Sequence, residues 1–198
     1  MISEPMTFAT DYVLAAAAAV IAVLVLRRAG GEHSRRSWGV AFIALALGAA
    51  LGGTHHGLRL AALWKPTVLV LGVASAGMVA GSALATVPGM WRLALIALAA
   101  AKLAVYWLWV WRDDRFIWVV ADTGSAFAIV ALLHLVAWRR PGSRWIVAGV
   151  AVSIAAAAVQ ASGLDLYRHF NHNDLYHLVQ LAALLAYYRG VRVLADRR

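Results

Sequence analysis

The chain has 198 residues, of which 63% are hydrophobic and 14% are charged, and its formal net charge is +9. A soluble domain carries about 25% charged and roughly 45–50% apolar residues, so this composition excludes an ordinary soluble protein and indicates a membrane protein. Cysteine is absent, which excludes disulfides, thiolate nucleophiles and cysteine-bound metals. The basic residues lie in the short connections between apolar stretches, which favours membrane contact over nucleic acid binding.

Seven apolar stretches follow one another along the chain, and each is close to the roughly 20 residues that a membrane-spanning helix needs. Short connections rich in charges, prolines and glycines separate them. We therefore predict one all-α domain over residues 1–198, a polytopic membrane protein built as a seven-transmembrane-helix bundle. Its expected spans are 9–27, 37–62, 66–87, 89–110, 116–138, 144–164 and 172–190.

The first stretch is preceded by Glu4 and contains Asp11, with no Lys or Arg before it. A signal peptide begins with a positive region, so we expect this stretch to be a retained helix. Most tryptophans fall near the expected helix ends, as in the aromatic belts at the two membrane interfaces.

The basic residues are unequally divided between the two sides of the expected bundle. One side holds Arg27, Arg28, Arg35, Arg36, Arg92, Arg139, Arg140, Arg144, Arg189, Arg192, Arg197 and Arg198. The other side holds Arg59, Lys65, Arg112, Arg115 and Arg168. Because cytoplasmic loops carry the excess of Lys and Arg, the pattern predicts an outside N-terminus and a cytoplasmic C-terminus.

Histidines converge on the outer half of the expected bundle. His55 and His56 lie late in the second stretch, and His169, His172 and His177 surround the start of the seventh. Ionisable residues inside a membrane are costly and are functional candidates by default. This convergence of two distant segments is the strongest functional signal of the sequence.

The geometry of a helix narrows the choice among these histidines. At about 100° per residue, His169 and His177 share one face of the seventh helix with Asn173, Tyr176 and Gln180. His172 lies on the other flank, unless the helix starts at Asn173 and leaves it free to turn inward. His55 and His56 are also about 100° apart, so we expect only His56 to face the bundle centre.

Imidazole groups of this kind suit zinc, and a catalytic zinc has three protein ligands plus a water of lowered pKa. The sequence predicts a zinc site held by His56, His172 and His177, with His55 and His169 as further candidates. Asp122 or Asp174 would assist proton transfer. Asp122 has a second interpretation, as the ion-pair partner of Lys102. The histidines have two alternative interpretations, a metal-free polar network and contacts with lipid headgroups.

A seven-helix core with His56 late in its second helix and His177 early in its seventh resembles the alkaline ceramidase and adiponectin-receptor-like superfamily. The resemblance implies a zinc-dependent hydrolase of lipid amides. The chain departs from the family pattern at three positions. Asn173 occupies the place of the first His of the final His pair, and Gly52 occupies the place of the Ser that precedes the helix 2 His in the family. The family's Asp in the next segment is missing, and Thr67 is the nearest polar residue to its place. The third metal ligand and the water-orienting groups would have to come from other residues.

The chain also looks like small bacterial seven-helix membrane proteins, which implies the bacterial cytoplasmic membrane. Our leading hypothesis is a membrane-embedded, zinc-dependent hydrolase that cleaves a lipid amide or ester by metal-activated water. One alternative is a proton- or metal-ion-translocating protein that uses the same His and Asp residues. Another is a haem protein with His56 and His177 as axial ligands.

Overall fold

The computed structural model describes residues 2–167 and 170–197, and within them the chain forms seven α-helices and one short 3₁₀ helix. The elements are α1 (Pro5–Arg27), α2 (His33–Leu58), η1 (Ala61–Leu63), α3 (Trp64–Thr86), α4 (Gly89–Arg112), α5 (Ile117–Val136), α6 (Ser143–Ser162) and α7 (His172–Val191). The all-α prediction is confirmed. Helix α1 begins earlier than expected, because Pro5 occupies its first turn, where a missing N–H costs little.

Helix α2 ends four residues before the expected end of the second span. Arg59 adopts a left-handed conformation (φ 52°), which stops the helix, and η1 then leads into α3. The expected span 37–62 therefore corresponds to α2 shifted toward the N-terminus. The other expected spans agree with the helices within a few residues.

In the described part of the chain, six segments are long and apolar enough to cross a membrane: α1, α2, Ala61–Thr86, α4, α5 and α6. Helix α7 is not among them, although it has 20 residues. Its first turns carry His172, Asn173, Asp174, His177 and Gln180, which lower its hydropathy. The same residues that make α7 a functional candidate thus weaken its signal as a span.

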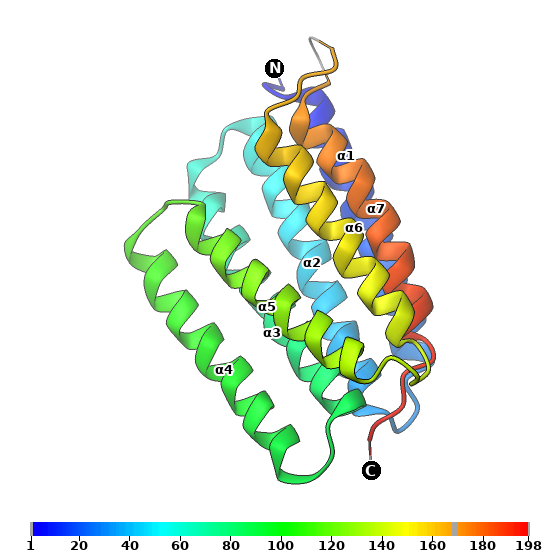
Figure 1. Ribbon diagram of the computed structural model, residues 1–198. Coiled ribbons are helices and arrows are strands. Elements are labelled where there is room, and N and C mark those ends of the chain that lie inside the picture. The colour runs from blue at the N-terminus through cyan, green and yellow to red at the C-terminus, as the bar shows by residue number, and fades with distance from the viewer. Residues whose placement is uncertain (1, 168–169, 198) are drawn as a thin grey trace.

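Six helices pack as a closed ring in the order α1, α2, α3, α5, α6 and α7, and α7 packs back against α1. Helix α4 lies outside this ring, against α3 and α5, and forms one edge of the molecule (Figure 1). The two chain ends lie at opposite ends of the bundle (Figure 1). The ring therefore brings the first and last helices side by side.

Glycines allow the closest helix approaches in the ring. A Cβ atom on Gly53 of α2 would lie 2.7 Å from the Cβ of Asp11 on α1, and one on Gly149 of α6 would lie 2.5 Å from the Tyr187 ring on α7. Small residues at such interfaces are typical of helices that pack without a hydrophobic driving force between them. These contacts fix the distances between the side chains described below.

The C-terminal segment closes the end of the bundle opposite to the N-terminus. The Asp196 carboxylate accepts hydrogen bonds from the backbone N–H groups of His33 and Ser34, at 2.8 Å each, in the first turn of α2. Burial raises the pKa of Asp196, but the hydrogen bonds from Ser34 and His33 outweigh it and hold the pKa below its usual 3.8. Asp196 thus satisfies α2 N–H groups that have no partner inside the helix.

Candidate functional site

The imidazole of His177 is held through both ring nitrogens at the N-terminal end of the bundle. Its Nε2 lies 3.2 Å from Asp11 Oδ1, and its Nδ1 lies 2.9 Å from the Thr10 hydroxyl. His177 is 7% exposed and Asp11 is 5% exposed. The site is therefore a buried carboxylate–imidazole–hydroxyl chain that joins α1 to α7.

Asp174 completes this cluster from the first turn of α7. Its Oδ1 lies 3.4 Å from the Thr10 hydroxyl, and its Oδ2 accepts a hydrogen bond of 2.8 Å from the backbone N–H of Asn171. The Asn171 side chain in turn accepts bonds from the backbone N–H groups of Asn173 and Asp174, at 2.8 and 3.3 Å. This reciprocal capping box starts α7 at His172 and holds Asp174 rigidly beside Thr10.

The proton on Thr10 has three nearby acceptors. Besides His177 Nδ1 and Asp174, the Thr7 carbonyl lies 3.2 Å from the Thr10 hydroxyl. When Thr10 donates to Nδ1, the imidazole proton sits on Nε2 and faces Asp11. When Thr10 donates to Asp174 or to the Thr7 carbonyl, Nδ1 is free to accept a proton while Nε2 still faces Asp11. The cluster can therefore take up a proton at Nδ1 after a rotation of the Thr10 hydroxyl.

His56 and His55 lie at the end of α2, with their ring centroids 5.4 Å apart. His56 Nδ1 lies 3.6 Å from Glu4 Oε2, and the nearby Ser3 hydroxyl donates to the His56 carbonyl at 2.5 Å. His55 Nδ1 lies 3.0 Å from the carbonyl of Leu60. The N-terminal residues before α1 thus cover the α2 end beside His56.

His172 lies at the first position of α7 and turns toward Asp165 in the connection that precedes it, with 3.1 Å between Nδ1 and Oδ1. The predicted ligand His169 lies outside the described residues. Each histidine of the predicted zinc set, His56, His172 and His177, therefore faces a different carboxylate: Glu4, Asp165 and Asp11. Within residues 2–167 and 170–197, no three His, Asp or Glu side chains gather closely enough to hold a metal ion.

Asp122 lies in another cluster, between α3, α4 and α5. Its Oδ2 accepts a hydrogen bond of 2.5 Å from Ser75, and its Oδ1 forms an ion pair with the partly buried Lys102 of α4. Lys102 also lies 3.4 Å from the Ser75 hydroxyl. These contacts are those of the ion pair that the sequence offered as one of two interpretations of Asp122.

Sequence reasoning missed two members of the His177 cluster, Thr10 and Asp11. One signal for Asp11 was available, because a carboxylate within the first apolar stretch is costly and needs a partner. The identity of that partner depended on α1 packing against α7, which no pattern along the chain reveals. Only Asp174 and His177 were singled out beforehand.

Comparison with known proteins places most of the chain in one family. Residues 6–196 match the family described as "Family of unknown function (DUF6962)". Neither the curated proteins nor the solved structures contain a match to the chain. Since the match extends over all seven helices, the chain belongs to the family of unknown function DUF6962.

Proposed function

We propose that this protein is an integral membrane hydrolase that cleaves a lipid-type amide or ester at the His177 cluster. The proposal takes all seven helices, including α7, as membrane-spanning. The basic residues then place the N-terminus outside the bacterial cytoplasmic membrane and the C-terminus inside. The His177 cluster would lie in the outer leaflet, at the depth of a lipid's linkage to its headgroup.

One observation carries the proposal: a buried imidazole is held at Nε2 by Asp11 and at Nδ1 by Thr10. A carboxylate that orients an imidazole and stabilises its protonated form is a general acid–base unit. Proton transfer by such a unit contributes typically 10²–10⁴-fold to a rate.

The reaction would consume one water. With the Thr10 hydroxyl turned to Asp174 or to the Thr7 carbonyl, Nδ1 of His177 accepts a proton from the water as the water oxygen bonds to the carbonyl carbon of the lipid. The carbon–nitrogen or carbon–oxygen bond then breaks, and the proton passes from His177 to the leaving amine or alcohol. Asp11 supports the imidazolium between the two transfers, and Asp174 holds Thr10 in place.

Zinc held by His56, His172 and His177 remains the metal prediction for this chain, and His177 Nε2 contacts the Asp11 carboxylate directly. The described residues place no third ligand beside this pair, so the steps above use no metal, and zinc stays a prediction that elemental analysis of purified protein would test.

The test is hydrolysis by the full chain reconstituted in lipid, assayed on a panel of N-acyl and O-acyl lipids by release of fatty acid. We expect His177→Ala to lower the rate by roughly 10²-fold or more and Asp11→Asn to lower it by a similar factor. His172→Ala is the matched histidine control and should retain activity. Loss of activity and of zinc in His172→Ala would instead restore the ligand set predicted from the sequence.

A second candidate, proton translocation, is favoured by a polar chain on α6 and α7 that continues from this cluster. Tyr176, next to His177, accepts a hydrogen bond from Gln180 at 3.3 Å, and Ser153 bonds to Gln180 at 2.9 Å and to Tyr187 at 3.2 Å. Proton flux into proteoliposomes, abolished by Gln180→Leu, would support this candidate. The haem alternative is tested by a Soret band in the purified protein.

A further inference from the structure

The ring of six helices encloses a cavity of about 270 Å³. Each of α1, α2, α3, α5, α6 and α7 contributes lining residues, and the peripheral α4 contributes none. A water molecule takes about 30 Å³ of liquid, so the cavity has room for roughly nine groups of that size. Folded interiors rarely keep voids much larger than one water molecule, so a cavity of this size is expected to bind a guest molecule.

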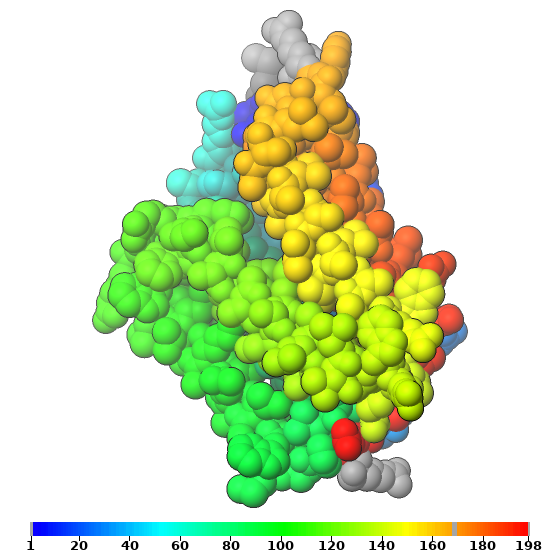
Figure 2. All heavy atoms as spheres, in the orientation of Figure 1, coloured from blue at the N-terminus to red at the C-terminus, as the bar shows by residue number. Residues whose placement is uncertain are grey.

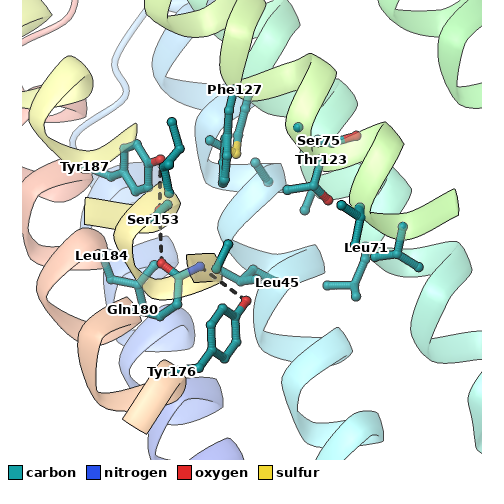
Figure 3. Close-up of a pocket in the computed structure, with 18 of the residues that line it drawn as sticks. Leu45, Leu71, Ser75, Thr123, Phe127, Ser153, Tyr176, Gln180, Leu184 and Tyr187 are labelled. Carbon is teal, nitrogen blue, oxygen red and sulfur yellow. Dashed lines mark hydrogen bonds between the residues drawn. The ribbon is translucent and has the colours of Figure 1, made fainter. Parts of the chain in front are cut away.

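Most of the cavity wall is apolar. The α1, α2 and α3 side presents Leu14, Phe42, Leu45, Leu71 and Met78. Phe127 of α5 projects into the same space from the opposite side (Figure 3). A charged or strongly hydrated molecule would lose its hydration without replacement here, so the wall favours a hydrocarbon guest.

The wall formed by α6 and α7 is different. Tyr176, Gln180 and Tyr187 lie along one face of α7, and Ser153 of α6 joins Gln180 to Tyr187 by hydrogen bonds (Figure 3). Each hydroxyl and the Gln180 amide keep donor or acceptor capacity beyond these bonds. The strip can therefore hydrogen-bond one polar group on an otherwise apolar guest.

Thr123 of α5 adds a hydroxyl on another side of the cavity (Figure 3). It makes no hydrogen bond to any residue in the described part of the chain. A guest with a hydroxyl or carbonyl group could hydrogen-bond to it.

The lining residues indicate that the cavity opens sideways between α5 and α6, which lie on the near face of the molecule in Figure 2. Lining residues on both helices are also exposed at the protein surface: Phe116, Val120 and Gly124 beside or on α5, and Ile154 and Ala157 on α6. In a membrane-embedded bundle this surface faces hydrocarbon. A guest would therefore enter from the bilayer and not from water.

We infer that this cavity binds one bilayer-dissolved amphiphile, a medium-length or cyclic hydrocarbon that carries a hydroxyl or carbonyl group. It enters between α5 and α6 and hydrogen-bonds to the Tyr176–Gln180–Ser153–Tyr187 strip. The inference rests on the proposed membrane embedding, and it does not require hydrolysis at His177.

The experiment uses the full chain in lipid nanodiscs and two photoreactive probes, a diazirine-bearing decanol and the matching diazirine-bearing decane. After irradiation, mass spectrometry maps the labelled peptides. We expect the alcohol to label α6 and α7 residues of the cavity, and to label them more than the alkane does. Excess unlabelled decanol should suppress this labelling.

Gly124→Leu tests the site directly, because Gly124 lines the cavity and a Cβ there meets no atom within 4 Å, which leaves space for a larger side chain at the opening. We expect it to reduce cavity labelling roughly tenfold. Ala121→Leu, exposed on the same helix and outside the cavity lining, is the matched control and should leave labelling unchanged. Gln180→Leu should remove the preference for the alcohol, about 2- to 10-fold, while alkane labelling persists.

Labelling that spreads evenly over the lipid-facing helices and is unchanged by Gly124→Leu would overturn the inference. Equal labelling by alcohol and alkane in the unmodified chain would overturn the claim that the guest hydrogen-bonds to the Tyr176–Gln180–Ser153–Tyr187 strip. His177→Ala should retain cavity labelling. A chain that binds the alcohol but hydrolyses no lipid would contradict the proposed function and still support this inference.

Discussion

Asp11 and His177 face each other across 3.2 Å from the first and the last helix of the chain. Both side chains are buried, and the pair ties α1 to α7 where the helical ring closes. A buried polar group that loses its partner costs about 1–3 kcal/mol. The pair should therefore contribute to stability as well as to any chemistry.

We expect Asp11→Leu and His177→Leu each to destabilise the protein by about 1–3 kcal/mol. In the double variant neither side chain is left without its partner, so its loss should be smaller than the sum of the single losses, by roughly 0.5–3 kcal/mol. Unfolding in mixed detergent micelles measures the stability of the unmodified chain, the two single variants and the double variant. Strictly additive losses would show that the two side chains are not coupled.

Gly53 should tolerate no side chain, because a Cβ there would lie 2.7 Å from the Asp11 Cβ. Gly53→Ala must push α1 away from α2, and we expect a destabilisation of about 1–3 kcal/mol, an overpacking cost. A weaker Asp11–His177 contact should accompany it. Thermal unfolding in detergent gives the first effect, and the activity assay gives the second.

Gly52→Ala is the matched control on the same turn of α2. Its Cβ would lie 3.6 Å from a Thr67 methyl group, which is ordinary contact. Alanine also favours a helix over glycine by roughly 0.5–1 kcal/mol, so this variant should be neutral or slightly stabilised. Equal destabilisation by both alanines would contradict the close approach at Gly53.

The Lys102–Asp122 pair should behave as a buried ion pair. Lys102→Met or Asp122→Leu alone leaves an uncompensated charge, and we expect each to cost about 3–5 kcal/mol. The double variant should recover most of that loss, since replacing a buried pair by apolar residues is often neutral. Expression level and unfolding midpoint measure the recovery.

The same double variant separates the two interpretations of Asp122. If Asp122 is structural, the stable double variant keeps its hydrolytic activity. If Asp122 is catalytic, as the first sequence hypothesis has it, the double variant is folded and inactive.

Asp196 should make the end of the bundle sensitive to acid. Its pKa in the folded protein lies below 3.8, because hydrogen bonds from Ser34 and His33 favour the carboxylate. The unfolded chain binds the proton more tightly, so the stabilisation is complete above the unfolded pKa, about 4, and is lost as the pH falls through the folded pKa. We expect Asp196→Asn to lower the unfolding temperature at pH 6–7.

The difference between Asp196→Asn and the unmodified chain should shrink as the pH falls below about 4. Thermal unfolding at pH 3, 4, 5 and 7 measures it. A difference that stays constant over this range would show that the Asp196 carboxylate does not contribute through its charge.

The sequence by itself determined the number and nearly the ends of the helices, because apolar runs of spanning length and the charges between them are local features. It also marked His177 and Asp174 as candidates, because ionisable groups in apolar helices are energetically costly and therefore indicate a functional role. It could not fix the end of α2, which depends on one backbone conformation at Arg59.

The tertiary structure alone decided which side chains meet. Helical periodicity predicts which residues share a face of a helix but not which residues of other helices lie beside them. The contacts of His56, His172 and His177 with Glu4, Asp165 and Asp11 were therefore not predicted. The meeting of Asp11 with His177 depends on α1 packing into the groove at Gly53 and on α7 closing the ring. The central cavity has the same origin, because its walls come from six helices distributed along the whole chain.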